Sequence, residues 1–257
     1  MSSGIFHRQI STEGDALIAI HGLFGSLENL GVITRQLASE YAVYALDLPN
    51  HGRSTHTDDV SLTSMAQTVV EWMSEQRIEH AHFLGHSLGG KVAMEVALRH
   101  PEKVKRLIVA DIAPVNYTRR HDDVFAAFRA VDFASIKTRM DADKQMRPHI
   151  EELSTRSFLL KNLDKTESGW EWRVNLEGLI AAYDHLICAN TTEFPAFDGE
   201  VLFIKGEHSP YILPEHREAI LSLFPRASVK VINNTQHWLH AEKPDIFSGI
   251  VKRFLVS

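Results

Sequence analysis

The chain lacks several features that would assign it to a specialised class. Cys188 is the one cysteine among 257 residues, so no disulfide can form within the chain, which favours a reducing compartment. No stretch approaches the roughly 20 apolar residues of a membrane-spanning helix. The N-terminal residues MSSGIFHRQI also lack the apolar segment and cleavage site of a signal peptide. We therefore expect a cytoplasmic protein without a membrane span.

Basic runs and metal-ligand patterns are missing as well. The formal net charge is −6 and no run of Lys or Arg occurs, which argues against a nucleic-acid partner. No spacing such as H-x-H-x-D or H-E-x-x-H predicts a metal site, and we expect no cofactor. Hydrophobic residues (44%) and charged residues (23%) are present in the proportions of an ordinary globular protein.

Short apolar runs alternate with helical patterns along most of the chain, which predicts an α/β fold with a mostly parallel central sheet. The expected strands are Ala16–Ile20, Tyr41–Leu46, Ala81–Leu84, Arg106–Ala110, Val201–Lys205 and Ser228–Ile232. The expected helices are Leu27–Ser39, Leu62–Gln76, Leu88–Arg99, Pro214–Leu223 and Asp245–Phe254.

The alternation stops between residues 115 and 187, where the pattern is helical and charged and shows no clear strand. A plain loop of about 70 residues would be unusual in a compact domain. We interpret 115–187 as a helical cap inserted into a core made of residues 1–114 and 188–257. WEWRVN (170–175) is a candidate for a short extended piece within the cap.

The stretch GHSLGGKV (85–92) fits two motifs that imply different functions. G-x-x-x-x-G-K would be a phosphate-binding loop, but that loop needs Ser or Thr after its lysine to hold Mg²⁺, and Val92 stands there. G-x-S-x-G is a nucleophile elbow, which requires a strand before it and a helix after it. The sequence predicts a strand before Ser87 and a helix after it. We therefore interpret Ser87 as a nucleophile, and we do not interpret Lys91 as a phosphate ligand.

A serine nucleophile needs a base and an oxyanion hole. The elbow predicts the chain order Ser, then acid, then His, and His237 follows the last expected strand. His240 is its near competitor. The backbone N–H of Leu88, directly after the serine, and that of Leu23, in the loop HGLFGS (21–26), are the candidate oxyanion donors.

Together HGLFGS, DLPNHGRS (47–54), GHSLGGK and QHWLHAEKP (236–244) resemble the α/β-hydrolase superfamily. ADIAPVNY (110–117) and GEHSPYI (206–212) make the chain more narrowly similar to small bacterial esterases that act on acyl esters and acyl-CoA thioesters. The resemblance implies an eight-stranded, mostly parallel sheet with a cap. Because the chain offers little before Ala16, the first strands are expected to be short or missing.

The acid of the implied Ser-Asp-His triad departs from the usual pattern. Most relatives carry an Asp in a G-x-x-D turn after the strand that here is Val201–Lys205, and Ser209 occupies that position. Asp111, at the end of the preceding strand, and Glu207, in the turn itself, are the alternatives. We favour Asp111, with Ser209 as a possible fourth member bonded to Asp111 or His237.

The expected function is hydrolysis of a small-molecule carboxylic ester or thioester, including acyl-CoA, through an acyl-enzyme. Phe24, Tyr211 and Trp238 are candidates for an apolar acyl site, and Arg119 and Arg120 for binding an anionic group of the substrate. Two alternatives stay open: a scaffold of this fold that binds a small ligand without turnover, and a carbon–carbon hydrolase or lyase. The sequence does not determine the oligomeric state.

Overall fold

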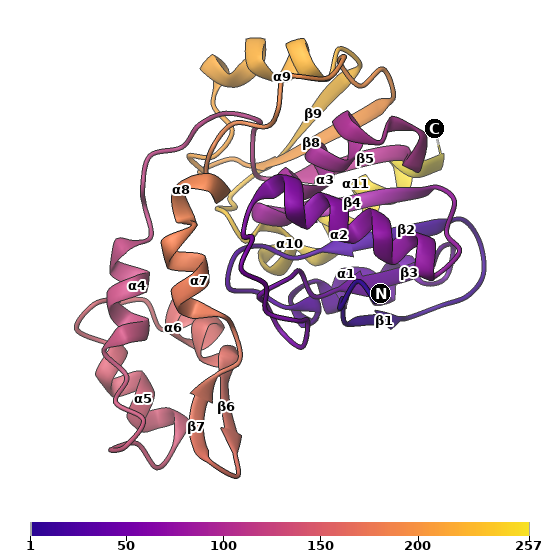
Figure 1. The fold of residues 1–257 in the computed structure, drawn as a ribbon. Helices are drawn as coiled ribbons and strands as arrows, with labels where there is room; N and C mark the ends of the chain where they lie inside the picture. The colour runs from indigo at the N-terminus through magenta and orange to yellow at the C-terminus, as the bar shows by residue number, and fades with distance from the viewer. Residues whose placement is uncertain (1, 257) are drawn as a thin grey trace.

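A seven-stranded sheet forms the centre of the computed structural model, which describes residues 2–256 (Figure 1). The strand order is β1-β3-β2-β4-β5-β8-β9, in which β1 is antiparallel to its neighbour and the others are parallel. This confirms the predicted mostly parallel sheet. The strands are β1 (His7–Gln9), β2 (Ala16–Ile20), β3 (Ala42–Leu46), β4 (Ala81–His86), β5 (Val104–Ala110), β8 (Glu200–Gly206) and β9 (Ala227–Ile232).

The six strands expected from the apolar runs all form, and their ends differ from the prediction by two residues or fewer. The apolar residues of β2, β4 and β5 are buried because helices cover both faces of the sheet. The resemblance implied eight strands, whereas residues 2–256 contribute seven to this sheet. Only the three-residue strand β1, polar and partly exposed, precedes β2.

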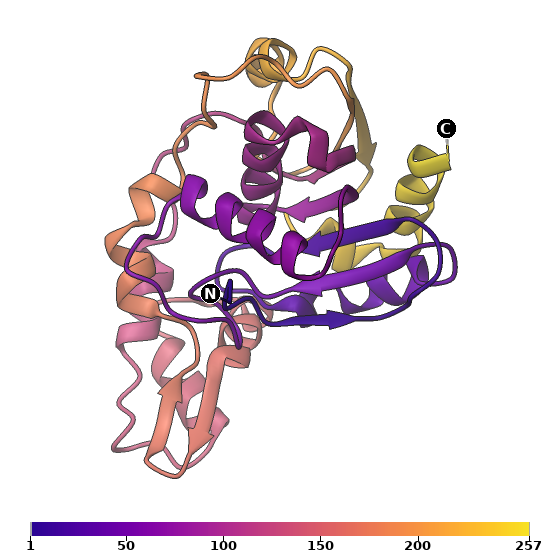
Figure 2. The same ribbon diagram turned by 45° about the vertical axis from the view of Figure 1, so that its right-hand side comes forward.

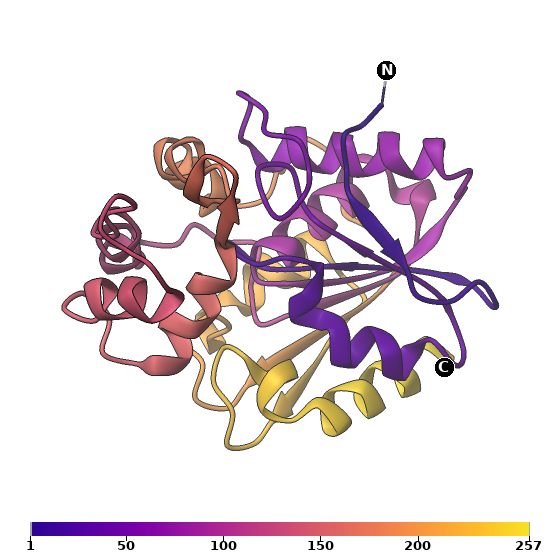
Figure 3. The ribbon, with the colours of Figure 1, turned by 90° about the horizontal axis from the view of Figure 1, so that it is seen from below.

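Helices pack on both faces of the sheet, as Figure 3 shows. One face is covered by α2, α3 and α9, and the other by α1 and α11; each face has its own buried apolar cluster. No helix within residues 2–256 is long and apolar enough to cross a membrane. The core helices are η1 (Leu27–Leu30), α1 (Gly31–Leu37), α2 (Leu62–Glu75), α3 (Leu88–Arg99), η2 (Pro101–Lys103), η4 (Pro214–His216), α9 (Arg217–Leu223), α10 (Leu239–Glu242) and α11 (Pro244–Val256).

The segment between β5 and β8 projects from the sheet as a separate group of helices (Figures 1 and 2). It also contains a two-stranded antiparallel hairpin, which the sequence did not predict as a whole. The second strand, Gly169–Trp172, confirms residues 170–172 of the expected extended piece. The hairpin was hard to predict because its first strand, LDKT, is mostly polar. The segment comprises α4 (Asp122–Arg129), α5 (Arg139–Met146), α6 (Leu153–Leu159), η3 (Leu160–Asn162), β6 (Leu163–Thr166), β7 (Gly169–Trp172), α7 (Leu176–Ala181) and α8 (Tyr183–Leu186).

We keep 115–187 as the proposed extent of the cap, between core segments 1–114 and 188–257. Residues 1 and 257, the outer ends of those segments, lie outside the described residues.

Lys91 joins α3 to both ends of this segment. Its ammonium group is buried and donates hydrogen bonds to the carbonyl oxygens of Val115 (3.0 Å) and Cys188 (2.6 Å). Burial lowers the pKa of Lys91 to about 8. The lysine that matched the phosphate-loop motif therefore donates to two backbone carbonyls at the base of the cap.

Lys91→Met should destabilise the protein, because it leaves two carbonyl acceptors without their charged donor. An unsatisfied buried polar group costs about 1–3 kcal/mol, and we expect a loss in the free energy of unfolding of that size in urea denaturation. Lys230→Met, at an exposed lysine of β9, serves as the control and should change little. Equal stability of the two variants would show that the Lys91 contacts contribute nothing.

Candidate active site

Ser87 lies in the turn between β4 and α3, in a backbone conformation that L residues rarely adopt (φ 53°, ψ −119°). The turn is tight enough to exclude side chains beside it. A Cβ on Gly85 would lie 2.2 Å from the carbonyl oxygen of Gly89, and a Cβ on Gly89 would lie 2.3 Å from that of Ile20. The flanking glycines are therefore required by the close approach of backbone atoms, as the elbow motif implies.

Asp111 and His237 meet beside this turn. The Nδ1 atom of His237 lies 2.8 Å from Oδ2 of Asp111, a carboxylate that is fully buried at the end of β5. Oδ1 of Asp111 accepts a hydrogen bond from the backbone N–H of Gly206 (3.0 Å). Because a carboxylate only accepts, Nδ1 carries the proton and Nε2 is left with its lone pair.

The two other residues considered for the acid position have different surroundings. The hydroxyl of Ser209 donates a short hydrogen bond to Asp111 Oδ2 and accepts one from the N–H of Tyr211 (3.3 Å). Glu207 is partly exposed, and its Oε2 accepts from the N–H of Asn234 (2.7 Å). Asp111, and not Glu207, contacts the histidine ring.

Backbone N–H groups of the predicted oxyanion hole come from the first residue of α3 and from the loop after β2. Leu88 begins α3 directly after Ser87, and Leu23 lies in the loop after β2, on the cavity that Ser87 also lines. Neither N–H donates a hydrogen bond within residues 2–256. The second loop is held in shape by Phe24, which has φ 58° and whose carbonyl accepts from the buried Asn162 side chain (2.7 Å).

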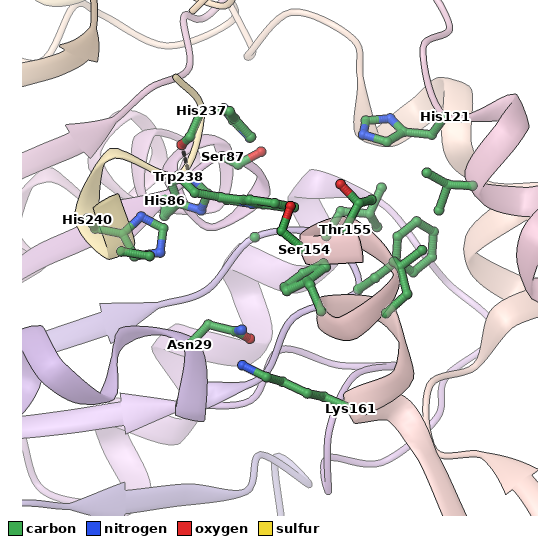
Figure 4. A pocket seen from close by; sticks show the side chains of 17 residues that line it. Asn29, His86, Ser87, His121, Ser154, Thr155, Lys161, His237, Trp238 and His240 are labelled. Carbon is green, nitrogen blue, oxygen red and sulfur yellow. Dashed lines mark hydrogen bonds between the residues drawn. The ribbon is translucent and has the colours of Figure 1, made fainter. Parts of the chain in front are cut away.

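A cavity of about 260 Å³ opens in front of Ser87 and His237 (Figure 4). Phe24 and Trp238, two of the candidates for an acyl site, line it. Tyr211 lies instead against His237, with the centres of the two stacked rings 4.1 Å apart, and lines a second, smaller cavity. The lining of the large cavity is Gly22, Leu23, Phe24, Asn29, His86, Ser87, His121, Val124, Ser154, Thr155, Phe158, Leu159, Lys161, His237, Trp238, His240 and Ala241.

The two arginines predicted to bind an anion have different environments. Arg119 forms ion pairs with Asp122 (3.0 Å) and Asp184 (2.7 Å) and lines neither of these cavities. Arg120 lines the smaller cavity, where its guanidinium lies 5.5 Å from the centre of the Tyr211 ring. Of the two, only Arg120 is positioned near the serine.

Sequence reasoning missed the wall of the large cavity that α4, α6 and η3 supply. His121, Ser154, Thr155, Phe158 and Lys161 belong to no recognisable motif. Amphipathic spacing could have identified helices in the cap, but the spacing carries no information on which helix faces the serine.

Buried histidines surround the site without carrying charge near neutral pH. Burial lowers the pKa of His86 well below its usual value, that of His121 to about 4 and that of His240 to about 3. His86 Nε2 donates to the backbone carbonyl of His237 (2.9 Å), and the His240 ring lies 4.3 Å from that of His86. His240, in the short helix α10, therefore packs behind the loop that carries His237.

The comparison with family models decides the family. The α/β hydrolase fold model matches residues 15–244. The chain belongs to the α/β-hydrolase family. It is 39% identical over 240 residues to "Esterase YbfF" of Escherichia coli, covering 93% of this chain and 92% of the relative. It is 35% identical over 248 residues to "sn-1-specific diacylglycerol lipase ABHD11" of Mus musculus, covering 93% of this chain and 80% of that one.

Solved structures support the same assignment. This α/β hydrolase superposes on the structure entitled "Marine microorganism esterase" with a TM-score of 0.95 and 36% sequence identity, covering 97% of this chain and 98% of the other. The agreement extends over both the core and the cap, so the cap is part of the architecture that the two proteins share.

Acid should destabilise this hydrolase through the histidine at the start of the HGLFGS loop. His21 Nε2 accepts from the N–H of Leu48 (3.0 Å), and burial lowers the pKa of His21 to about 4 from 6.5. Between pH 4 and pH 6.5 the unfolded chain binds more protons at His21 than the folded chain does. The contribution of neutral His21 to the free energy of unfolding is therefore complete above pH 6.5 and is lost as the pH falls towards 4. The loss is at most about 1.4 kcal/mol per pH unit for one group.

Urea unfolding at several pH values between 4 and 7 measures this dependence. The slope should be shallower in His21→Asn than in the wild type, and it should be unchanged in His149→Asn, which alters an exposed histidine. The same slope in all three proteins would exclude His21 as a source of the acid sensitivity.

Proposed function

We propose that this protein hydrolyses carboxylic esters through a covalent acyl-enzyme, with Ser87, His237 and Asp111 as its catalytic residues. The observation that carries the proposal is the 2.8 Å bond between His237 and the buried Asp111, on the cavity where the strained Ser87 turn opens. A serine hydroxyl is a weak nucleophile without such a base. The names of the relatives, an esterase and a diacylglycerol lipase, support an ester substrate.

In the first half of the reaction Ser87 Oγ attacks the acyl carbonyl carbon as His237 Nε2 takes the hydroxyl proton. The tetrahedral oxyanion collapses, and the bond to the leaving oxygen breaks as His237 returns the proton to that oxygen. In the second half a water molecule gives its proton to His237 and attacks the acyl carbon. Ser87 leaves, regains a proton and releases the carboxylic acid.

Asp111 and the two loop N–H groups have supporting roles in this proposal. The carboxylate of Asp111 holds the Nδ1-protonated tautomer of His237 and stabilises the imidazolium that forms during each transfer. The N–H groups of Leu23 and Leu88 donate to the oxyanion, which is supported by their lack of another acceptor. Ser209 positions Asp111, since its hydroxyl bonds the same Oδ2 atom that contacts His237.

The acyl group is proposed to lie against Phe24, Trp238 and Phe158. The rings of Trp238 and Phe158 are 5.4 Å apart, so core and cap together form this apolar surface. Thioesters, including acyl-CoA, are a finer extension of the proposal, because a thiolate leaves the same tetrahedral intermediate readily. Arg120 is the better of the two arginine candidates for a substrate anion, since carboxylates already pair with Arg119. We also keep the cytoplasmic location as a proposal.

Ser87→Ala should abolish hydrolysis of a chromogenic acyl ester and of an acyl-CoA while leaving the fold intact. Loss of a triad nucleophile lowers kcat on the order of 10⁴-fold or more. Ser154→Ala, which removes another hydroxyl from the same cavity, is the matched control and should retain most of the activity. A sulfonyl fluoride should add once to the wild type, on Ser87, as read by mass spectrometry.

Near wild-type hydrolysis by Ser87→Ala, or an adduct on another residue, would contradict the proposed mechanism. Binding of esters by the wild type without any product would instead favour the non-turnover scaffold. Cleavage of a carbon–carbon bond in preference to esters would favour the other alternative of the same fold.

Asp111→Asn should lose most of its hydrolytic activity, because the amide favours the wrong imidazole tautomer of His237. We expect a loss on the order of 10³- to 10⁴-fold in kcat, as for other triad acids. Glu207→Gln should cost less than about tenfold, since Glu207 bonds a backbone N–H away from the ring, and Ser209→Ala should fall between the two. All three are assayed on one ester at one pH. A larger loss in Glu207→Gln than in Asp111→Asn would move the acid to Glu207.

A further inference from the structure

The large cavity contains a polar region that the proposed reaction does not use. Figure 4 shows the amino group of Lys161 and the side-chain amide of Asn29 turned toward one another, at the opposite end of the view from Ser87. Lys161 comes from η3 in the cap and Asn29 from η1 in the core. The two segments are far apart in the sequence, so only the folded chain creates this pair of donors.

The charge of Lys161 is not balanced by the protein. The Lys161 side chain is exposed, and its ammonium group forms no ion pair or hydrogen bond within residues 2–256. The backbone next to it is nevertheless well held, because the buried side chain of Asn162 donates to the carbonyls of Phe24 (2.7 Å) and Leu159 (3.1 Å). The ammonium group therefore extends from a fixed base.

Asn29 presents a donor in the same direction. Its Oδ1 accepts the backbone N–H of Ser26 (2.6 Å), which fixes the orientation of the amide. The Nδ2 group then has two N–H donors, and neither has an acceptor within the described residues. An ammonium and an amide N–H₂ facing one space make a site for an acceptor group, and a negatively charged acceptor would be bound most strongly.

The rest of the cavity lining agrees with an anionic ligand. Among the lining residues there is no Asp or Glu, and the lowered pKa values of His86, His121 and His240 leave those rings neutral near pH 7. Apart from the histidines, Lys161 is the one ionisable side chain in this lining. A negative group entering the cavity therefore meets no repelling carboxylate there.

We propose that Lys161 and Asn29 form a subsite for a carboxylate or phosphate of the substrate, so that the preferred esters carry a negative charge away from the scissile carbonyl. The proposal rests on the proposed ester hydrolysis, because Ser87 must act at the other end of the same cavity. It assigns Lys161 and Asn29 to substrate specificity and gives them no part in bond cleavage.

Matched ester pairs test the subsite. Mono-4-nitrophenyl adipate and 4-nitrophenyl hexanoate differ by a charge on the acyl half, and 4-carboxyphenyl butyrate and 4-acetylphenyl butyrate by a charge on the alcohol half. The wild type should favour the charged member of one pair, which identifies the half that reaches the subsite. In Lys161→Met the kcat/KM for that charged ester should fall by roughly two- to fivefold, the range for losing a charged contact from an exposed lysine.

Conservative changes and a matched control separate a specific role from a structural one. Lys161→Arg should preserve the preference for the charged ester. Asn29→Asp keeps the acceptor for the Ser26 N–H while replacing the donor by a negative group, so it should weaken the charged ester selectively. Lys144→Met removes an exposed cap lysine outside this lining and should leave all four kcat/KM values unchanged.

Three outcomes would overturn the subsite. The first is an equal loss of kcat/KM for charged and neutral esters in Lys161→Met, and the second is a wild type that prefers neither charged ester. The third is a preference for a charged ester that Arg120→Met removes and Lys161→Met does not. The last would assign the anion to the smaller cavity.

Failure of ester hydrolysis itself is distinguished by binding. If the wild type hydrolyses none of the four esters, calorimetry still tests the subsite by measuring the binding of monomethyl adipate, which is charged, and of methyl hexanoate, which is neutral. Tighter binding of the charged ligand that is lost in Lys161→Met supports the subsite, and equal binding of both ligands contradicts it.

Discussion

The turn from β4 into α3 leaves no room for a side chain at Gly85 or Gly89, and the geometry of the candidate site depends on that close approach of backbone atoms. The turn fixes the point at which Ser87 leaves the sheet. Parallel strands end at one edge, so Asp111 after β5 and His237 after β9 arrive at the same edge as Ser87. Residues distant in the sequence thus converge because of the sheet topology.

Ser87 and Asp111, which follow the neighbouring strands β4 and β5, are linked in this arrangement. Asp111 also has a positive φ (55°), and the N–H of Ser87 donates to the carbonyl of Ala110 (3.0 Å), directly before Asp111. The buried carboxylate is compensated by three donors, namely the Gly206 N–H, the Ser209 hydroxyl and His237 Nδ1. A buried carboxylate is tolerated only with such a complete set of partners. Ser209 thus supplies one of the three donors that compensate the buried carboxylate of Asp111.

Local patterns predicted the parts of the molecule whose chemistry is local. The elbow needs its glycines in a fixed spacing, so Ser87 could be read from the sequence. Apolar runs that need burial predicted five long strands, and β9 was predicted by its apolar residues although most of them are exposed. β1 was not predictable, because three polar residues at a sheet edge carry no period. Lys161 and Asn29 come together only through tertiary packing. Arg119 pairs with Asp184, 65 residues away, and no sequence spacing predicts this pair.

The attachment of the cap through Lys91 makes the position of Ser87 independent of the length of the cap. Val115, the first residue of the proposed cap, and Cys188, the first residue after it, both accept hydrogen bonds from one ammonium group on α3, one helical turn after Ser87. The entropic cost of closing a loop rises only slowly with its length. Helices can therefore be added to or removed from the distal hairpin end during evolution without shifting the serine. The wall that the cap contributes to the cavity can thus change while Ser87 stays in place.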